Sequence, residues 1–111
     1  MKVPNKNRAI ITESKLVDYL LNPGHERGGS KAKKLLRYGY SPDCWQQLEL
    51  DIRRFHLNAD VSAVRETSYG VRYIVEAPLT TPIKRALYVR TVWQVDKGTD
   101  VPRLITLVPS R

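Results

Sequence analysis

A histidine beside a glycine-rich segment and a run of cations is the strongest candidate for chemistry in this sequence. His25 exchanges a proton near neutral pH, and Gly28, Gly29 and Ser30 follow it closely. Backbone N–H groups of such a loop, and the N-terminus of a helix starting at Ser30, attract anions. Lys31 places a cation where the helix dipole alone disfavours one. The pattern predicts a phosphate site in which His25 is a general acid or base and Lys31 stabilises phosphate charge.

The alternative for His25 is an exposed loop histidine with no partner. The other histidine, His56, is expected at the C-terminal end of a helix, where the dipole favours a cation. The Gly-x-x-x-x-Gly-Lys-Ser/Thr spacing of nucleotide-hydrolysing loops is absent from the sequence. The single cysteine, Cys44, excludes an intrachain disulfide and a cysteine-rich zinc site. Neither a metal nor a cofactor is therefore expected.

Two further polar side chains are candidates in the second half of the chain. Arg90 lies within an alternating segment, on the side away from the apolar set, where it can hold a phosphate through two hydrogen bonds. The alternative is a cross-strand ion pair between Arg90 and Glu76. Thr106 interrupts the apolar run 104–108 and can donate a hydroxyl, although threonine is also an ordinary strand residue. The alternation leaves the direction of the Thr106 side chain open.

The charge of the chain favours a polyanionic partner. There are 19 Lys and Arg against 11 Asp and Glu, which leaves a formal net charge of +8 and a pI near 9.9. RNA, DNA, anionic lipid and an acidic protein all fit this charge, and a solubilising surface is the alternative. The side chains expected to contact nucleic acid are Arg27, Lys33, Lys34, Arg37, Arg72 and Tyr88.

Three helices are predicted in the first half of the chain from capping residues and apolar spacing. They span 12–21, 31–38 and 42–56. Thr12, Ser30 and Ser41 are N-cap residue types, and Gly39 ends the second helix. Leu16, Tyr19 and Leu20 share one face of the first helix, and this apolar stripe is expected to cover the sheet.

After Asn58 the apolar period changes to two, which is typical of strands. Four strands are expected at 61–67, 71–77, 87–95 and 104–108, joined by turn-rich links. The predicted fold class is α+β, with three N-terminal helices packed on one face of a four-stranded antiparallel meander. The opposite face is expected to stay open to a ligand.

The length and composition fit one domain. The chain has 111 residues, of which 41% are hydrophobic, and can bury a single core. Residues 12–111 are assigned to this domain, and residues 1–11 to a flexible lead-in whose Ile10 and Ile11 can also dock on the core. The sequence shows no secretory signal and no membrane span, so a cytoplasmic location without a membrane partner is expected.

Four stretches resemble a family of small bacterial domains of poorly established function, which occur alone or at the C-termini of toxin-like proteins. The stretches are 15–25, 29–32, 89–93 and 102–106, and the similarity covers nearly the whole chain. The order of helices and then four strands also resembles the barnase-EndoU-colicin-RelE superfamily of metal-independent ribonucleases and toxins. This second resemblance implies that His25, Lys31, Arg90 and Thr106 act on one phosphodiester, with Thr91 as a less favoured substitute for Thr106.

The leading hypothesis is a metal-independent endoribonuclease domain, such as the toxin of a toxin-antitoxin or polymorphic toxin system. Its expected partners are RNA or another polyanion and an acidic antitoxin or immunity protein. One alternative is a non-catalytic RNA-binding module that uses the same basic loop and open sheet face. The other alternative is a basic protein-interaction domain that docks an acidic partner.

Overall fold

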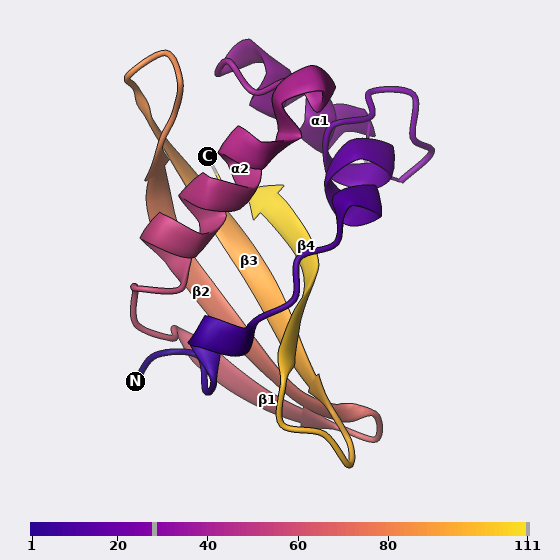
Figure 1. Ribbon diagram of the computed structural model, residues 1–111, viewed down its shortest axis with the longest axis vertical. Helices are drawn as coiled ribbons and strands as arrows, with labels where there is room; N and C mark the ends of the chain where they lie inside the picture. Colours follow the sequence, from indigo (N-terminus) through magenta and orange to yellow (C-terminus); the bar gives the residue numbers. More distant parts are fainter. Residues whose placement is uncertain (28, 111) are drawn as a thin grey trace.

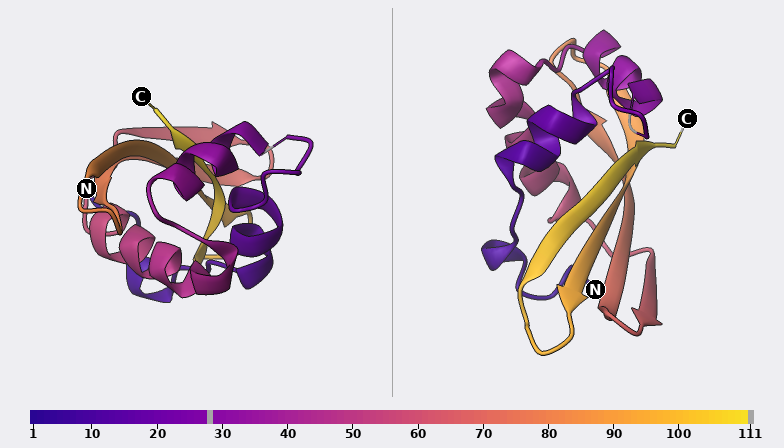
Figure 2. Two further views of the ribbon diagram at one scale, coloured as in Figure 1. Left: turned by 90° about the horizontal axis from the view of Figure 1, so that it is seen from above. Right: turned by 90° about the vertical axis from the view of Figure 1, so that its right-hand side faces the viewer.

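The second half of the chain forms the sheet that its two-residue period predicts. The computed structural model describes residues 1–27 and 29–110. The strands are β1 (Ala63–Thr67), β2 (Gly70–Thr80), β3 (Ala86–Asp96) and β4 (Pro102–Pro109), in the order β1-β2-β3-β4. All neighbouring pairs are antiparallel, so the predicted four-stranded meander is confirmed. The helical segments lie against one face of this sheet (Figure 1, Figure 2).

The first half of the chain is helical, but it is not built as three regular helices. The segments are η1 (Lys6–Arg8) and η3 (Pro42–Cys44), both 3-10 turns, the π-helical η2 (Lys15–Leu20) and η4 (Ile52–His56), and the α-helices α1 (Gly29–Arg37) and α2 (Trp45–Asp51). The predicted helix 12–21 is mainly π-helical, and the predicted helix 42–56 is divided among η3, α2 and η4. The prediction of three N-terminal helices is not confirmed in this detail.

The two π-helical segments arise from apolar residues that stand five positions apart. The N–H of Leu21 donates to the carbonyl of Leu16 at 2.8 Å, and the N–H of Leu57 donates to that of Ile52 at 3.3 Å. All four side chains are buried. A hydrogen bond that spans five residues brings both ends of each pair to one side of the helix. The 3.6-residue period used to predict helices does not anticipate this spacing.

Two of the predicted helix boundaries are confirmed by their capping geometry. The Ser41 hydroxyl accepts the backbone N–H of Asp43 at 3.1 Å, with Pro42 in the first turn. Gly39 follows α1 with a φ of 100°, in the left-handed region that glycine adopts without a steric penalty.

The helix that carries Lys31 begins earlier than the sequence predicts. α1 begins at Gly29, so Ser30, the expected N-cap, lies within its first turn. A Cβ on Gly29 would stand 2.5 Å from the carbonyl oxygen of Pro23, so glycine lets the helix start this close to the preceding turn. Gly28, which belongs to the same glycine-rich loop, lies outside the described residues.

Residues 1–11 lie against the domain. Val3 and Ile11 are buried, and Ile10 forms a parallel bridge with Arg103 of β4. Two backbone hydrogen bonds of 2.9 Å flank this bridge. The segment thereby covers part of the outer edge of β4. Ile11 docks on the core, as the sequence allowed, while the flexibility expected of residues 1–11 stays a prediction.

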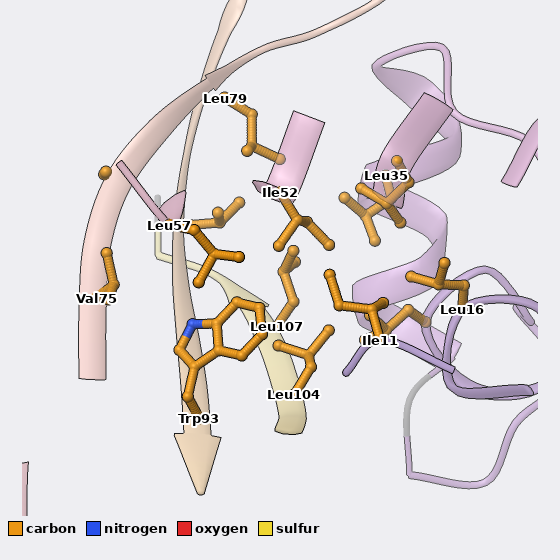
Figure 3. Packing of buried hydrophobic residues seen from close by; sticks show 14 of the residues in the cluster. Ile11, Leu16, Leu35, Ile52, Leu57, Val75, Leu79, Trp93, Leu104 and Leu107 are labelled. Carbon is orange, nitrogen blue, oxygen red and sulfur yellow. The ribbon is translucent and has the colours of Figure 1, made fainter. Parts of the chain in front are cut away.

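The core lies between the sheet and the helical layer. Trp93 of β3 and Leu107 of β4 point toward Ile52 of η4 and Leu35 of α1 (Figure 3). All four side chains have an exposed fraction of 0%. Burying a side chain of this size contributes roughly 1.5–3 kcal/mol. Because the core draws on both layers, it sets the position of the helices relative to the sheet.

A chain of buried hydrogen bonds joins η4 to β2 and β3. Nε2 of His56 lies 2.9 Å from the carbonyl oxygen of Ala77, and Nδ1 lies 2.7 Å from the Thr91 hydroxyl oxygen. The indole N–H of Trp93 donates to the same hydroxyl at 2.9 Å. Because the carbonyl only accepts, Nε2 carries the proton and the Thr91 hydroxyl donates to Nδ1. Each polar atom of this chain is therefore partnered, as burial requires.

His56 therefore has a different role from the one that its position suggested. It does stand at the end of a helical segment, but it is fully buried and neutral rather than a cation favoured by the dipole. Burial lowers its pKa to about 4, because the charged ring loses its hydration. Thr91, named as a substitute for Thr106, belongs to this buried chain and faces the core.

A β-bulge in β4 decides which of its residues face the core. Thr106 and Leu104 pair with consecutive residues of β3, so Ile105 is an extra residue in the strand. Strict alternation would place residues three apart on opposite faces, but here both Leu104 and Leu107 are buried. Thr106 pairs with Val92, so it is out of step with the buried pair of Thr91 and Leu107 that faces the core.

We expect the stability of the fold to fall by about 3 kcal/mol between pH 6.5 and pH 4 through His56 alone. Above pH 6.5 the His56 ring is neutral in both the folded and the unfolded protein. Between pH 6.5 and pH 4 it binds a proton in the unfolded chain but stays neutral in the folded one, so unfolding is favoured. Urea unfolding at a series of pH values measures the effect. His56→Gln should be less stable and should lack this component, whereas the matched variant His25→Gln should retain it. Equal pH dependence in both variants would contradict the assignment.

Candidate functional site

The hydroxyl of Tyr19 is the point where the predicted site residues meet. Tyr19 lies in η2, and Nζ of Lys31 in α1 donates to its hydroxyl oxygen at 2.9 Å. The Thr106 hydroxyl of β4 lies 3.3 Å from the same oxygen. Segments that are 12 and 87 residues away from Tyr19 in sequence thus converge on one atom.

His25 packs against the ring of the same tyrosine. The two ring centroids are 4.9 Å apart with an interplanar angle of 80°, which is an edge-on contact. Nδ1 of His25 accepts the backbone N–H of Arg27 at 3.0 Å. In the neutral ring, Nε2 therefore carries the proton. Three of the four predicted catalytic residues, His25, Lys31 and Thr106, are accordingly brought together around Tyr19.

The surroundings of Tyr19 favour negative charge on its oxygen. Nζ of Lys15 lies 5.1 Å and Nζ of Lys31 lies 5.3 Å from the centroid of its ring. The hydrogen bond from Lys31 is the main cause that lowers the pKa of Tyr19, followed by the bond to Thr106, while partial burial opposes them. A phenol in this setting releases its proton more readily than an ordinary tyrosine.

Arg90 lies on β3, the strand next to the one that carries Thr106. It pairs with Val108, and Val92 pairs with Thr106, so Arg90 and Thr106 are diagonal neighbours on one face. Such positions stand roughly 7–8 Å apart. The guanidinium of Arg90 also lies 3.8 Å from the Glu76 carboxylate, with both side chains about half exposed. The ion pair that the sequence left open is therefore present, and pairs as exposed as this one contribute about 0–1 kcal/mol.

A shallow depression lies between α1 and β4. Its volume is about 260 Å³, and its lining residues are Ser30, Lys31, Lys34, Val108 and Pro109. Val108 is the cross-strand partner of Arg90, so Arg90 stands on the strand next to this part of β4. The arrangement suits an anion that lies along the outer edge of β4.

The predicted contacts on α1 and in the turn before it form a basic surface beside the depression. Arg27, Lys33 and Arg37 are exposed, and Lys34 is partly buried. Lys33 and Arg37 also line a second, open depression of about 510 Å³ together with Ser30 and Leu36.

The predicted contacts on the sheet lie on the face away from the helices. Arg72 donates to the side-chain oxygen of Gln94 at 2.9 Å, which fixes its direction along the sheet. Tyr88 has an exposed fraction of 50% and stands two residues from Arg90.

Sequence reasoning missed Tyr19 as a site residue. Its place among leucines on one helical face indicated a core position, yet the side chain is only partly buried and its hydroxyl is engaged. The available signal was a tyrosine six residues before His25 in the stretch 15–25, which the family resemblance had already marked. A hydroxyl on an apolar stripe needs a partner, and that requirement points to nearby polar groups.

A larger cavity of about 580 Å³ lies elsewhere, between α2 and the link from β2 to β3. Its lining residues are Gln47, Asp51, Arg54, Phe55, Thr80, Thr81, Pro82 and Lys84. The buried Asp51 carboxylate accepts hydrogen bonds from the Tyr40 hydroxyl at 2.7 Å and the Gln47 amide at 3.0 Å. Both of its oxygens are therefore used to hold α2 in place.

Residues 1–27 and 29–110 contain no group of three or more His, Cys, Asp and Glu side chains that can hold a metal ion. Within the same residues, no helix has the length and apolar character needed to cross a membrane.

The model of the DUF6883 family, described as a domain of unknown function, matches residues 2–111. The chain belongs to the DUF6883 family. The resemblance to a family of poorly established function is thus confirmed at this level, whereas the resemblance to the barnase-EndoU-colicin-RelE superfamily stays a prediction. The comparison with curated proteins gave no match.

A solved structure shares the fold of this DUF6883 domain. It is a chain of a contact-dependent growth inhibition toxin and immunity protein complex from Klebsiella pneumoniae 342. The TM-score is 0.75 and the sequence identity is 20%, with 96% of this chain and 97% of that chain covered. At this identity the likeness is one of fold.

Absorbance titration should reveal a tyrosine with a pKa below the ordinary value of 10, and this titration step should be missing in Tyr19→Phe. Lys31→Met should raise this pKa, because the donor that stabilises the phenolate is removed. Lys33→Met, an exposed position on the same helix, is the matched control and should leave it in place. An unchanged titration in Lys31→Met would contradict the geometry.

Proposed function

We propose that this domain cleaves RNA without a metal ion and acts as the toxin of a toxin-immunity pair. The observation that supports it best is the convergence of His25, Lys31 and Thr106 on one tyrosine, Tyr19, at the edge of β4: Lys31 and Thr106 contact its hydroxyl and His25 contacts its ring. These residues come from a loop, a helix and a strand, so neither local propensity nor the core requires them to meet.

The chemistry of the cluster suits attack by a ribose 2′-hydroxyl on the adjacent phosphate. Such a reaction needs proton transfer and stabilisation of the charge that develops on the phosphoryl oxygens. His25 transfers a proton, Lys31 and Arg90 stabilise the charge, and Thr106 orients the phosphate. The depression of about 260 Å³ beside Lys31 is the place for the phosphodiester.

The surrounding surface suits binding of the RNA backbone. Lys33, Lys34 and Arg37 extend the positive charge along α1, and Arg27 adds to it from the turn before this helix. On the open sheet face, Arg72 meets phosphates and the half-exposed Tyr88 stacks on a base. Most of this binding is electrostatic, so added salt weakens it.

The proposed protein partner is an acidic immunity protein that covers the basic edge. The solved chain with the same fold belongs to a complex of a toxin with its immunity protein. The formal net charge of +8 and the cluster around Tyr19 support the toxin role for this chain. The helix-then-meander order also fits the barnase-EndoU-colicin-RelE superfamily.

The purified domain is expected to shorten total bacterial RNA in the presence of a chelator. His25→Ala should lower the initial rate by about 10²–10⁴-fold, the usual contribution of a general acid or base. Lys97→Ala, an exposed position in the β3–β4 turn, is the control and should cleave like the parent. Gel electrophoresis of end-labelled RNA measures the rate. RNA that is bound but stays full-length would support the alternative of a non-catalytic RNA-binding module instead.

Variants of Arg90 and Arg103 distinguish stabilisation of the charge that develops in the reaction from general attraction of RNA to a positive surface. Both arginines lie on the face away from the helices, and both form an ion pair. Arg90→Gln should lower the cleavage rate by about 10²–10³-fold, as removal of one group that stabilises developing charge does. Arg103→Gln removes the same charge at the start of β4 and should keep most of the activity. Equal losses in both variants would show that net charge alone matters.

A further inference from the structure

Cleavage by a 2′-hydroxyl involves two proton transfers, one from the attacking oxygen and one to the leaving 5′-oxygen. Among the four candidate residues, His25 is the one whose side chain is the most usual general acid or base, so it serves one of these transfers. We infer that Tyr19 is a further catalytic residue and serves the other transfer, as the general base that takes the proton of the 2′-hydroxyl. This inference rests on the proposed ribonuclease function.

The contacts of the Tyr19 oxygen favour the role of a base. The Lys31 ammonium can donate hydrogen bonds but cannot accept them, so its 2.9 Å hydrogen bond to that oxygen is strongest when the phenol is ionised. Thr106 can donate to the same oxygen at 3.3 Å. The lowered pKa of Tyr19 agrees with this geometry, because the same two contacts are its main causes.

Tyr40 shows how a neighbouring carboxylate, in place of lysines, affects the pKa of a tyrosine. The Tyr40 hydroxyl is buried and donates to the Asp51 carboxylate at 2.7 Å, so burial and the neighbouring negative charge raise its pKa. Tyr40 therefore keeps its proton and serves packing. Tyr19 stands partly exposed among cations, in the surroundings that an acting base requires.

The orientation of His25 assigns it the complementary transfer. While the ring is neutral, its Nδ1 accepts the backbone N–H of Arg27 at 3.0 Å, which leaves the proton of the ring on Nε2. To act as the acid, the His25 ring takes a second proton on Nδ1, gives up this hydrogen bond and then donates the proton of Nε2. Its ring meets the Tyr19 ring edge-on at 4.9 Å, which keeps the two proton-transfer groups within the reach of a single phosphodiester.

The reaction then balances within the cluster. The 2′-oxygen forms a bond to phosphorus while its proton passes to the Tyr19 phenolate. The bond from phosphorus to the 5′-oxygen breaks with its electron pair, and that oxygen takes the proton from Nε2 of cationic His25. The products are a 2′,3′-cyclic phosphate and a 5′-hydroxyl, and solvent restores both side chains.

The first experiment removes the hydroxyl and keeps the ring. Tyr19→Phe should cleave total bacterial RNA about 10²–10⁴-fold more slowly than the parent. It should bind a 2′-O-methyl RNA, which lacks the attacking hydroxyl, with a Kd within about threefold, because the Lys15 and Lys31 contacts with the ring remain. Tyr69→Phe, at a position with an exposed fraction of 73%, is the matched control and should keep full activity. Circular dichroism melting checks that both variants are folded.

The second experiment separates the base from the acid. Once the cleavage position is mapped, an RNA oligomer is made with sulfur in place of the leaving 5′-oxygen, because a thiolate departs without a proton. On this oligomer the cleavage rate of His25→Ala, relative to the parent, should be at least tenfold higher than on ordinary RNA. The relative rate of Tyr19→Phe should stay as low as on ordinary RNA.

The outcomes distinguish the two proposals. A parent protein that leaves RNA intact overturns the ribonuclease function and this inference together. A cleaving parent with an equally fast Tyr19→Phe overturns the inference alone. Recovery of Tyr19→Phe on the sulfur oligomer would also overturn it, because Tyr19 would then be the acid.

Discussion

The hydrogen-bonded chain from Trp93 through Thr91 and His56 to the carbonyl of Ala77 holds the helical layer on the sheet in one position. Apolar contacts such as those of Ile52 tolerate small sliding movements, whereas each polar atom of this chain is satisfied in one arrangement only. Leaving one of these atoms buried without a partner costs about 1–3 kcal/mol, a large share of the stability of a small domain. η4 is therefore fixed over β2 and β3, and η2 and α1, which pack on the same core, meet β4 at its edge.

The edge of β4 is where the sheet and the helical layer reach solvent together. Ile10 pairs with one part of this edge and leaves the part around Thr106 to Tyr19 and Lys31. Each contributing segment is held by a feature of its own: a π-helical turn in η2, a glycine at the start of α1 and a bulge in β4. A site built on such supports keeps its groups in place before a ligand arrives, which is what charge stabilisation in a reaction requires.

The excess of cations is spread over much of the chain, so charge alone does not single out a site. What distinguishes the cluster around Tyr19 is geometry: two ammonium groups near one ring, and a histidine on its edge. Tyr40, by contrast, donates its hydroxyl hydrogen bond to the Asp51 carboxylate and helps to hold the core together. The fold shared with a chain of a toxin and immunity protein complex fits many activities, so the chemistry has to be argued from such local contacts.

Local signals in the sequence determined the order of the elements, the meander and the identity of His25, Lys31 and Arg90 as candidates, because alternation, turns and helix caps act between residues close in the chain. The N-cap at Ser41 and the stop at Gly39 were readable for the same reason. The direction of Thr106 was not, since it depends on an extra residue in β4 whose presence only the pairing with β3 reveals. The role of Tyr19 was hidden too, because its hydroxyl acquires its partners from segments 12 and 87 residues away, and tertiary packing alone brings these together.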